Sequence, residues 1–177
     1  GKNSYLGRRI WLYKLGFTTV YTKSSYLNMN FIVLLLLSLS PGLAIILFIY
    51  FKDKYEQEPI KTLLISFVFG VAALLLAEVI TEFLNTEVKL HKDDLIEQAF
   101  RAFIFVALLE EALKFLFLRH AIYHNKNFDE PFDGIVYSVM IGMGFATAEN
   151  IVYVFSGGIS VGLLRMFTAV PAHATFA

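Results

Sequence analysis

The chain has 177 residues, of which 57% are hydrophobic and 17% are charged, and its formal net charge is zero. Soluble domains are about 45–50% apolar and 25% charged, so this composition indicates a membrane protein. Zero net charge gives no reason to expect a nucleic-acid partner. The absence of cysteine excludes disulfides and thiolate metal sites.

The first 29 residues form a basic and aromatic segment with no acidic residue. Segments of this charge stay on the cytoplasmic side of a membrane. We therefore expect residues 1–29 to be an interfacial segment on the inner leaflet or a partly ordered tail, and residues 30–177 to be the membrane domain. The basic residues are Lys2, Arg8, Arg9, Lys14 and Lys23.

Five apolar stretches are long enough to cross a membrane, which takes roughly 20 residues of helix. They are residues 31–51, 60–84, 99–119, 134–155 and 159–177. This pattern predicts an all-α, polytopic transmembrane helical bundle with about five spanning helices. Pro41-Gly42 predicts a kink in the first of them. With the basic segment inside the cell, the connectors alternate outside, inside, outside, inside.

The third stretch carries Glu110, Glu111 and Lys114 in its interior half. Each charge facing lipid there would cost about 2.5–3.5 kcal/mol, so these residues must face one another, another helix or a wet cavity. Lys114 can reach either acid, being three and four residues away. Adjacent glutamates differ by about 100° around a helix, so we expect them to point in different directions. Such a cluster suits a general base for water, and its alternative is a structural ion pair.

Other polar residues in the apolar stretches have simpler explanations. Glu78 and Glu82 lie near the end of the second stretch, where they can reach the interface. Arg165 can do the same or pair with an acid. His173 by itself would be a hydrogen-bonded contact between helices, and it gains a functional reading only in the company of other polar groups.

Small residues in the fourth stretch predict close helix packing. Gly142 and Gly144 make this helix narrow, and Glu149 and Asn150 follow directly, so we expect both to be held against a neighbouring helix. Asp133 has the residue type of a helix N-cap.

Four segments together resemble the PrsW family of intramembrane proteases. They are residues 40–70, the LEEALKF segment at 109–115, residues 132–153 with FDGIVYSVMIGMGFATAENIVY, and the stretch from Arg165 to His173. Their order and spacing agree with the family from about residue 38 to the end. This resemblance implies a glutamic intramembrane endopeptidase, similar to the type II CAAX prenyl endopeptidases and the bacteriocin-processing enzymes.

The resemblance also implies roles for particular residues. Glu110 and Glu111 match the family's Glu-Glu pair, one of them being the base that activates water, and His173 matches its first histidine. Supporting positions are Lys114, Glu149 and Asn150. The family's second histidine lies on a later helix and has no match here. We therefore expect the chain to be truncated at the C-terminus, with helices beyond Ala177, or to be inactive.

The resemblance implies no cofactor and no metal. The implied partners are the lipid bilayer and a membrane-anchored protein substrate, an anti-sigma factor in the family's namesake role. The implied location is a bacterial plasma membrane, crossed several times, with the N-terminus in the cytoplasm.

Two other functions stay open from the residues alone. One is a metal-dependent membrane hydrolase, because a carboxylate-rich set with one histidine can hold a divalent ion, although no HExxH motif is present. Its ligands would be Glu110, Glu111, Glu149 and His173. The other is a non-catalytic scaffold or transporter-like protein, whose polar cluster serves packing or a proton path.

Overall fold

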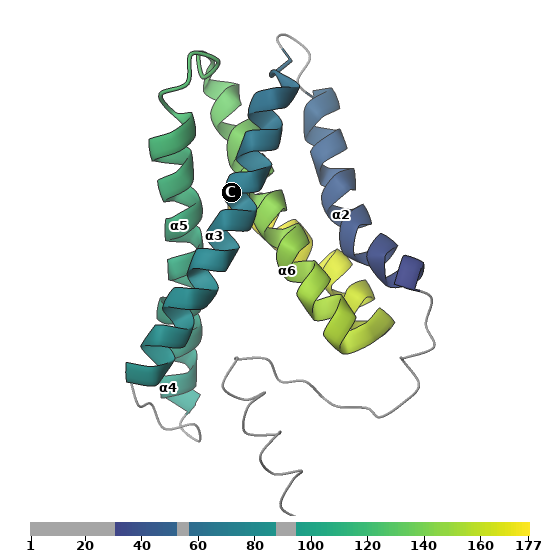
Figure 1. The fold of residues 1–177 in the computed structure, drawn as a ribbon, viewed down its shortest axis with the longest axis vertical. Coiled ribbons are helices and arrows are strands. Elements are labelled where there is room, and N and C mark those ends of the chain that lie inside the picture. Colours follow the sequence, from purple (N-terminus) through teal and green to yellow (C-terminus); the bar gives the residue numbers. More distant parts are fainter. Residues whose placement is uncertain (1–30, 53–56, 88–94) are drawn as a thin grey trace, which may run out of the picture.

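The structure is a computed structural model that describes residues 31–52, 57–87 and 95–177 (Figure 1). The predicted basic segment at 1–29 lies outside these residues. Every regular element in the described ranges is helical, which confirms the all-α prediction.

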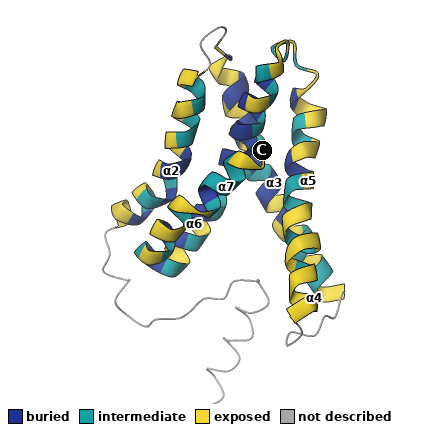
Figure 2. Ribbon diagram, turned by 180° about the vertical axis from the view of Figure 1, so that it is seen from behind, coloured by how far each residue is buried: buried dark blue, intermediate teal, exposed yellow. Residues whose placement is uncertain are grey.

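Three helices are long and apolar enough to cross a membrane: α2 (Phe31–Lys52), α3 (Ile60–Glu87) and the stretch Pro131–Thr175, which holds α6 (Pro131–Phe167) and α7 (Ala169–Thr175). Large apolar side chains such as Phe48, Leu64 and Phe83 are more than half exposed. Exposed residues recur along the helices of the bundle, α2 and α5 among them (Figure 2). Such a surface suits lipid rather than water. These features confirm a polytopic membrane protein, while the predicted count of five spans is not confirmed.

The third predicted stretch is one continuous helical segment of mixed geometry. It runs through α4 (Leu95–Phe100), the π-helical η2 (Arg101–Leu108), α5 (Leu109–Phe117) and the π-helical η3 (Leu118–Ile122). The segment lies beside α3 (Figure 1), and the two share a core with Phe145 of α6. The change from π-helix to α-helix comes just before Glu110, and such changes are frequent at functional sites.

Glycines allow α3 and α6 to cross almost backbone to backbone. A Cβ atom on Gly70 would overlap the carbonyl oxygen of Ile141, and one on Gly144 would overlap the carbonyl oxygen of Phe67. On another face of α6, a Cβ on Gly42 of α2 would meet the hydroxyl of Thr147. The narrow face predicted for the fourth helix therefore holds α6 at the centre of the bundle.

The start of α6 differs from the prediction at Asp133. The N-cap is Glu130, Pro131 occupies the first turn, and Asp133 is the third helical residue. The Asp133 carboxylate accepts hydrogen bonds from the backbone N–H groups of Asp129 and Glu130, at 2.9 and 2.7 Å. Asp133 thus completes a capping box rather than capping the helix itself, because proline fits the first turn and moves the start upstream.

The fifth predicted stretch, 159–177, begins just after a turn within α6 and is itself broken at Thr168. Gly158 has a φ of 78°, which only glycine adopts readily, and it turns the chain within α6. A second break at Thr168 separates α6 from α7. Residues after Gly158 therefore fold back along the earlier part of α6 instead of continuing away from it (Figure 1).

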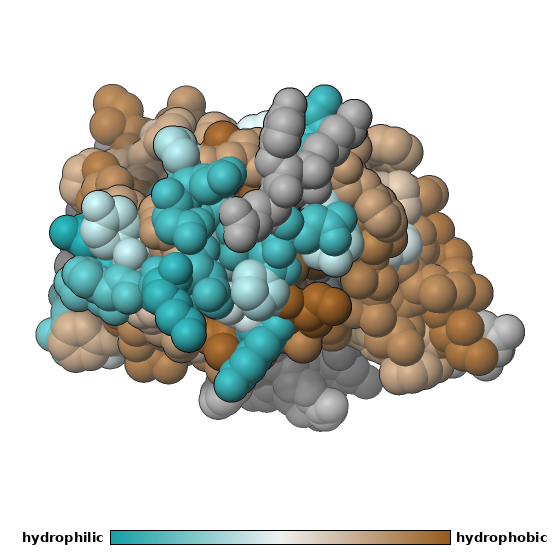
Figure 3. All heavy atoms as spheres, turned by 90° about the horizontal axis from the view of Figure 1, so that it is seen from above, coloured by the Kyte–Doolittle hydropathy of each residue, from teal (hydrophilic) through white to brown (hydrophobic). Residues whose placement is uncertain are grey.

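One end of the bundle is polar. There the start of α3 meets the connector before α6: the Asn127 amide donates to Thr62 Oγ1 at 3.0 Å, and the Tyr137 hydroxyl donates to the buried Glu58 carboxylate. Figure 3 views this end and shows hydrophilic residues gathered over the helix ends, with apolar residues around them. The start of α3 and the connector before α6 thus lie at the same end of the bundle.

Candidate active site

The ammonium group of Lys114 lies at the centre of the site. It donates to Glu111 Oε1 at 2.7 Å and to His173 Nδ1 at 2.9 Å, and it lies 4.2 Å from the centre of the Phe145 ring. The lysine is only 5% exposed, so its charge needs these partners. The contact joins α5, α6 and α7 in one place.

Glu110 differs from its neighbour because its carboxylate makes no hydrogen bond or ion pair with the described part of the chain. One ligand atom each from Glu110, Glu111 and His173 lies within 4.8 Å of the others. The prediction that the two glutamates point in different directions is therefore wrong at their tips. Their Cβ atoms diverge, but three rotatable bonds let both carboxylates turn toward the imidazole.

Glu149 lies on the other side of His173. Its Oε2 atom is 3.1 Å from His173 Nε2 and accepts a hydrogen bond of 2.6 Å from the Arg165 guanidinium. In a straight helix the 16 residues from Glu149 to Arg165 would span about 24 Å, so the turn at Gly158 makes this ion pair possible. Of the two roles left open for Arg165, the structure shows pairing with an acid.

Asn150 is completely buried and connects the site to α2. Its side-chain oxygen accepts from Arg165 Nε at 2.9 Å. Its amide group donates to the backbone carbonyls of Ser38 at 3.0 Å and Leu37 at 3.4 Å. As expected, Glu149 and Asn150 are both held against neighbouring segments.

Glu78 is a neighbour of the site. From the sequence, we expected this residue to reach the membrane interface. Its carboxylate interacts electrostatically with those of Glu149 and Glu110. Glu78 follows Gly70 by about two helical turns, so the α3–α6 crossing brings it toward the acids of the other helices. The spacing of about two helical turns between Gly70 and Glu78 could have predicted this position. That prediction would have required knowing which helix crosses α3 at Gly70.

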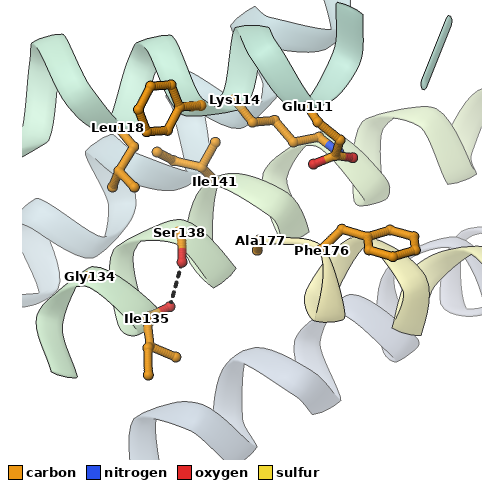
Figure 4. Close-up of a pocket in the computed structure, with 10 residues that line it drawn as sticks. Glu111, Lys114, Leu118, Gly134, Ile135, Ser138, Ile141, Phe176 and Ala177 are labelled. Atoms are coloured by element: carbon orange, nitrogen blue, oxygen red, sulfur yellow. Dashed lines mark hydrogen bonds and ion pairs between the residues drawn. The ribbon is translucent and has the colours of Figure 1, made fainter. Parts of the chain in front are cut away.

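A pocket of about 490 Å³ adjoins the cluster between α5 and α6 (Figure 4). Glu111 and Lys114 lie at one side of it, and Ser138 lies on the α6 wall, donating to the Ile135 carbonyl at 3.0 Å. The lining is otherwise largely apolar. The full lining is Glu111, Lys114, Phe115, Leu118, Gly134, Ile135, Ser138, Ile141, Phe176 and Ala177.

Fold and site together define a polytopic helical membrane protein with a carboxylate–ammonium–imidazole cluster enclosed by its helices. A family model described as "PrsW family intramembrane metalloprotease" matches residues 58–177. The chain belongs to the PrsW family, as the motifs at 109–115 and 132–153 predict.

Several relatives carry the name Protease PrsW. The protein of Geobacillus kaustophilus is 38% identical over 137 residues, covering 77% of this chain and 59% of that protein. The protein of Bacillus subtilis is 34% identical, with 77% and 60% covered. That of Clostridioides difficile is 37% identical over 152 residues, with 81% and 61% covered. The chain thus spans about three fifths of these relatives' length. No solved structure matches it.

Proposed function

We propose that this protein is an intramembrane endopeptidase that hydrolyses a peptide bond of a membrane-anchored protein. The observation that carries the proposal is the uncommitted carboxylate of Glu110 beside the Lys114 ammonium and the His173 imidazole. A carboxylate without a partner, next to a fixed positive charge in a water-poor site, has the properties of a general base.

In the first step, Glu110 removes a proton from a water molecule and the resulting hydroxide attacks the substrate carbonyl carbon. Negative charge develops on the carbonyl oxygen, and the Lys114 ammonium is the donor placed to stabilise it. Of the two glutamates, Glu110 is the proposed base, because Glu111 already accepts the Lys114 hydrogen bond. His173 Nδ1 holds the ammonium in position.

In the second step, the tetrahedral intermediate collapses and the carbon–nitrogen bond breaks. The proton on Glu110 passes to the leaving amine, which restores the carboxylate. The products are a free amine and a carboxylate, so the same residue serves as base and then acid.

The pocket between α5 and α6 is the proposed position of the substrate segment. Its apolar walls suit the side chains of an extended peptide, and its polar side leads to Glu111 and Lys114 (Figure 4). An anti-sigma factor is a candidate substrate, as the resemblance implied.

The proposed topology has five membrane-embedded segments. Three of them are α2, α3 and the part of α6 before Gly158, and the other two are segment 95–122 and the folded-back stretch after Gly158. The N-terminus lies in the cytoplasm.

A metal-dependent hydrolase is a second candidate because three potential ligand atoms converge. Glu110, Glu111 and His173 are donors of a kind that binds divalent ions, and they would hold one. A bound ion would supply Lewis-acid polarisation and a more acidic water. The Lys114 ammonium, however, engages both Glu111 and His173 Nδ1, so an ion using these atoms would have to displace it. This contact favours the mechanism without a metal.

The test compares new protein N-termini in the membrane fraction of a bacterium that expresses the full-length protein or its Glu110→Gln variant. We expect cleavage products that depend on Glu110 and persist in a Glu87→Gln control, whose glutamate is exposed at the end of α3. Identical N-termini for the wild type and the Glu110 variant would overturn the protease proposal in favour of a scaffold or transporter. Loss of cleavage on chelation, restored by a divalent ion, would replace the proposed mechanism by the metal-dependent one.

A further inference from the structure

We propose that Glu149 is a positioning residue for the His173 imidazole, and that a chain of contacts through Arg165 and Asn150 fixes Glu149 relative to α2. The inference rests on the proposed function, in which His173 holds the Lys114 ammonium. It assigns specific work to three polar residues that touch neither the proposed water nor the proposed substrate position.

The hydrogen bonds around His173 allow one protonation state. The ammonium of Lys114 can only donate, so His173 Nδ1 must accept and carries no proton. The ionised Glu149 carboxylate can only accept, so His173 Nε2 must carry the proton and donate it. The imidazole is therefore neutral and protonated at Nε2. The electron pair of Nδ1 accepts the hydrogen bond from Lys114.

Arg165 bridges Glu149 and Asn150 through two different nitrogen atoms. Its terminal nitrogen donates to Glu149 at 2.6 Å, and its Nε donates to Asn150 at 2.9 Å. The guanidinium plane also lies over the Tyr153 ring, 4.1 Å from its centre. A planar fork can bridge two acceptors on successive residues in this way, whereas a lysine ammonium lacks both the plane and the fork.

Asn150 connects this assembly to the kink of α2. Pro41 has no N–H group, so the carbonyl of Leu37, four residues earlier, loses its normal helical partner. The Asn150 amide donates to that carbonyl at 3.4 Å and to the Ser38 carbonyl at 3.0 Å. The proline therefore exposes a backbone acceptor that fixes a side chain of α6.

The consequence for the reaction concerns the moment when Lys114 turns toward a substrate oxygen. The contact between Lys114 and His173 then weakens, and Glu149 becomes the remaining group that holds the ring and its Nε2 proton. Without Glu149 in place, the ring is free to rotate or to move its proton, and the ammonium loses its support. Changes at Glu149 or Arg165 should therefore lower kcat and leave KM unchanged.

The test uses full-length protein in lipid nanodiscs with 15N-labelled histidine. Nitrogen shifts separate protonated from unprotonated ring nitrogens, and we expect His173 to carry a proton at Nε2 only. In Glu149→Gln the Nε2 proton resonance should move upfield, because a neutral amide is a weaker acceptor than a carboxylate. In Arg165→Lys the His173 signals should shift or double. Arg119→Lys, a matched change over the Tyr123 ring near the start of the α5–α6 connector, should leave them unchanged.

Activity on a substrate identified by N-terminal labelling provides the second measurement. Both site variants should lose on the order of 10- to 100-fold in kcat, the usual range for groups that orient a functional imidazole. A wild-type ring protonated at Nδ1, or at both nitrogens, would overturn the inference. Unchanged His173 signals together with unchanged kcat in Glu149→Gln and Arg165→Lys would also overturn the inference. The protease proposal would not be affected by that result. If cleavage never depends on Glu110, that proposal fails, while the nitrogen shifts still decide the network.

Discussion

Adding a single methyl group at Gly142 should move the backbone of His173 and with it the site. It lies on α6 under α7, and a Cβ atom there would be 2.8 Å from the carbonyl oxygen of His173. Carbon–oxygen contacts are comfortable at about 3.3 Å, so Gly142→Ala must push the backbone of His173 away by roughly half an ångström. Gly134→Ala is the matched control on the same helix, because its Cβ would lie 3.4 Å from the Phe128 ring.

The expected effects on stability and activity differ in size. Replacing glycine by alanine in a helix gains about 1 kcal/mol, and overpacking costs about 1–3 kcal/mol, so Gly142→Ala should lose at most about 2 kcal/mol of unfolding free energy. A misplacement of 1 Å can cost about 100-fold in rate, so half that distance should cost about tenfold in kcat. Gly134→Ala should leave the His173 nitrogen shifts unchanged and be as stable as the wild type or slightly more so.

Thermal unfolding in detergent, cleavage kinetics and the His173 nitrogen shifts measure these effects. Full activity with an unshifted imidazole in Gly142→Ala would refute the reasoning, since α7 would then not be held against α6 at this glycine. An equal shift of the His173 signals in Gly142→Ala and Gly134→Ala would refute it as well, because the control lacks the close approach to His173.

Three further changes probe other contacts. Pro41→Ala restores an N–H partner for the Leu37 carbonyl. Proline inside a helix is about 3 kcal/mol less favourable than alanine, so the unfolding temperature should rise. Because the Leu37 carbonyl is then no longer left for the Asn150 amide, kcat should fall. Lys114→Met should lower the unfolding free energy by about 1–3 kcal/mol in denaturant titrations, and adding Glu111→Gln should recover stability but not cleavage. Gly144→Leu should cost about 3 kcal/mol or more, seen as rapid proteolysis of the expressed protein, because α3 must separate from α6.

Much of the fold could be predicted because lipid restricts the possible structures. Backbone groups without water must pair within a helix, so long apolar runs mark α2, α3 and α6 directly. The boundary between the last two predicted stretches falls at Gly157-Gly158, where the chain turns. The break at Thr168 has no such signal, because it depends on how α7 packs against α6.

The site was predictable in its members but not in its pairings. Glu110, Glu111 and Lys114 are conspicuous because lipid excludes charge. Which carboxylate Lys114 chooses depends on side-chain torsions, and the partner of His173 depends on the rotation of α7 about its axis. Neither is encoded in helical spacing. The same holds for Glu78, whose position follows from the angle at which α3 crosses α6.

The balance of charge within the cluster singles out one residue. Glu111 is neutralised by Lys114 and Glu149 by Arg165, and His173 is neutral when both its nitrogens serve these partners. Every charge in this network is therefore matched inside the described part of the chain. Glu110 remains as an additional carboxylate next to the matched pairs, and Glu78 stands at their exposed edge. An unmatched acid at this depth is unfavourable for folding, so its presence is best explained by a reaction that needs a base there.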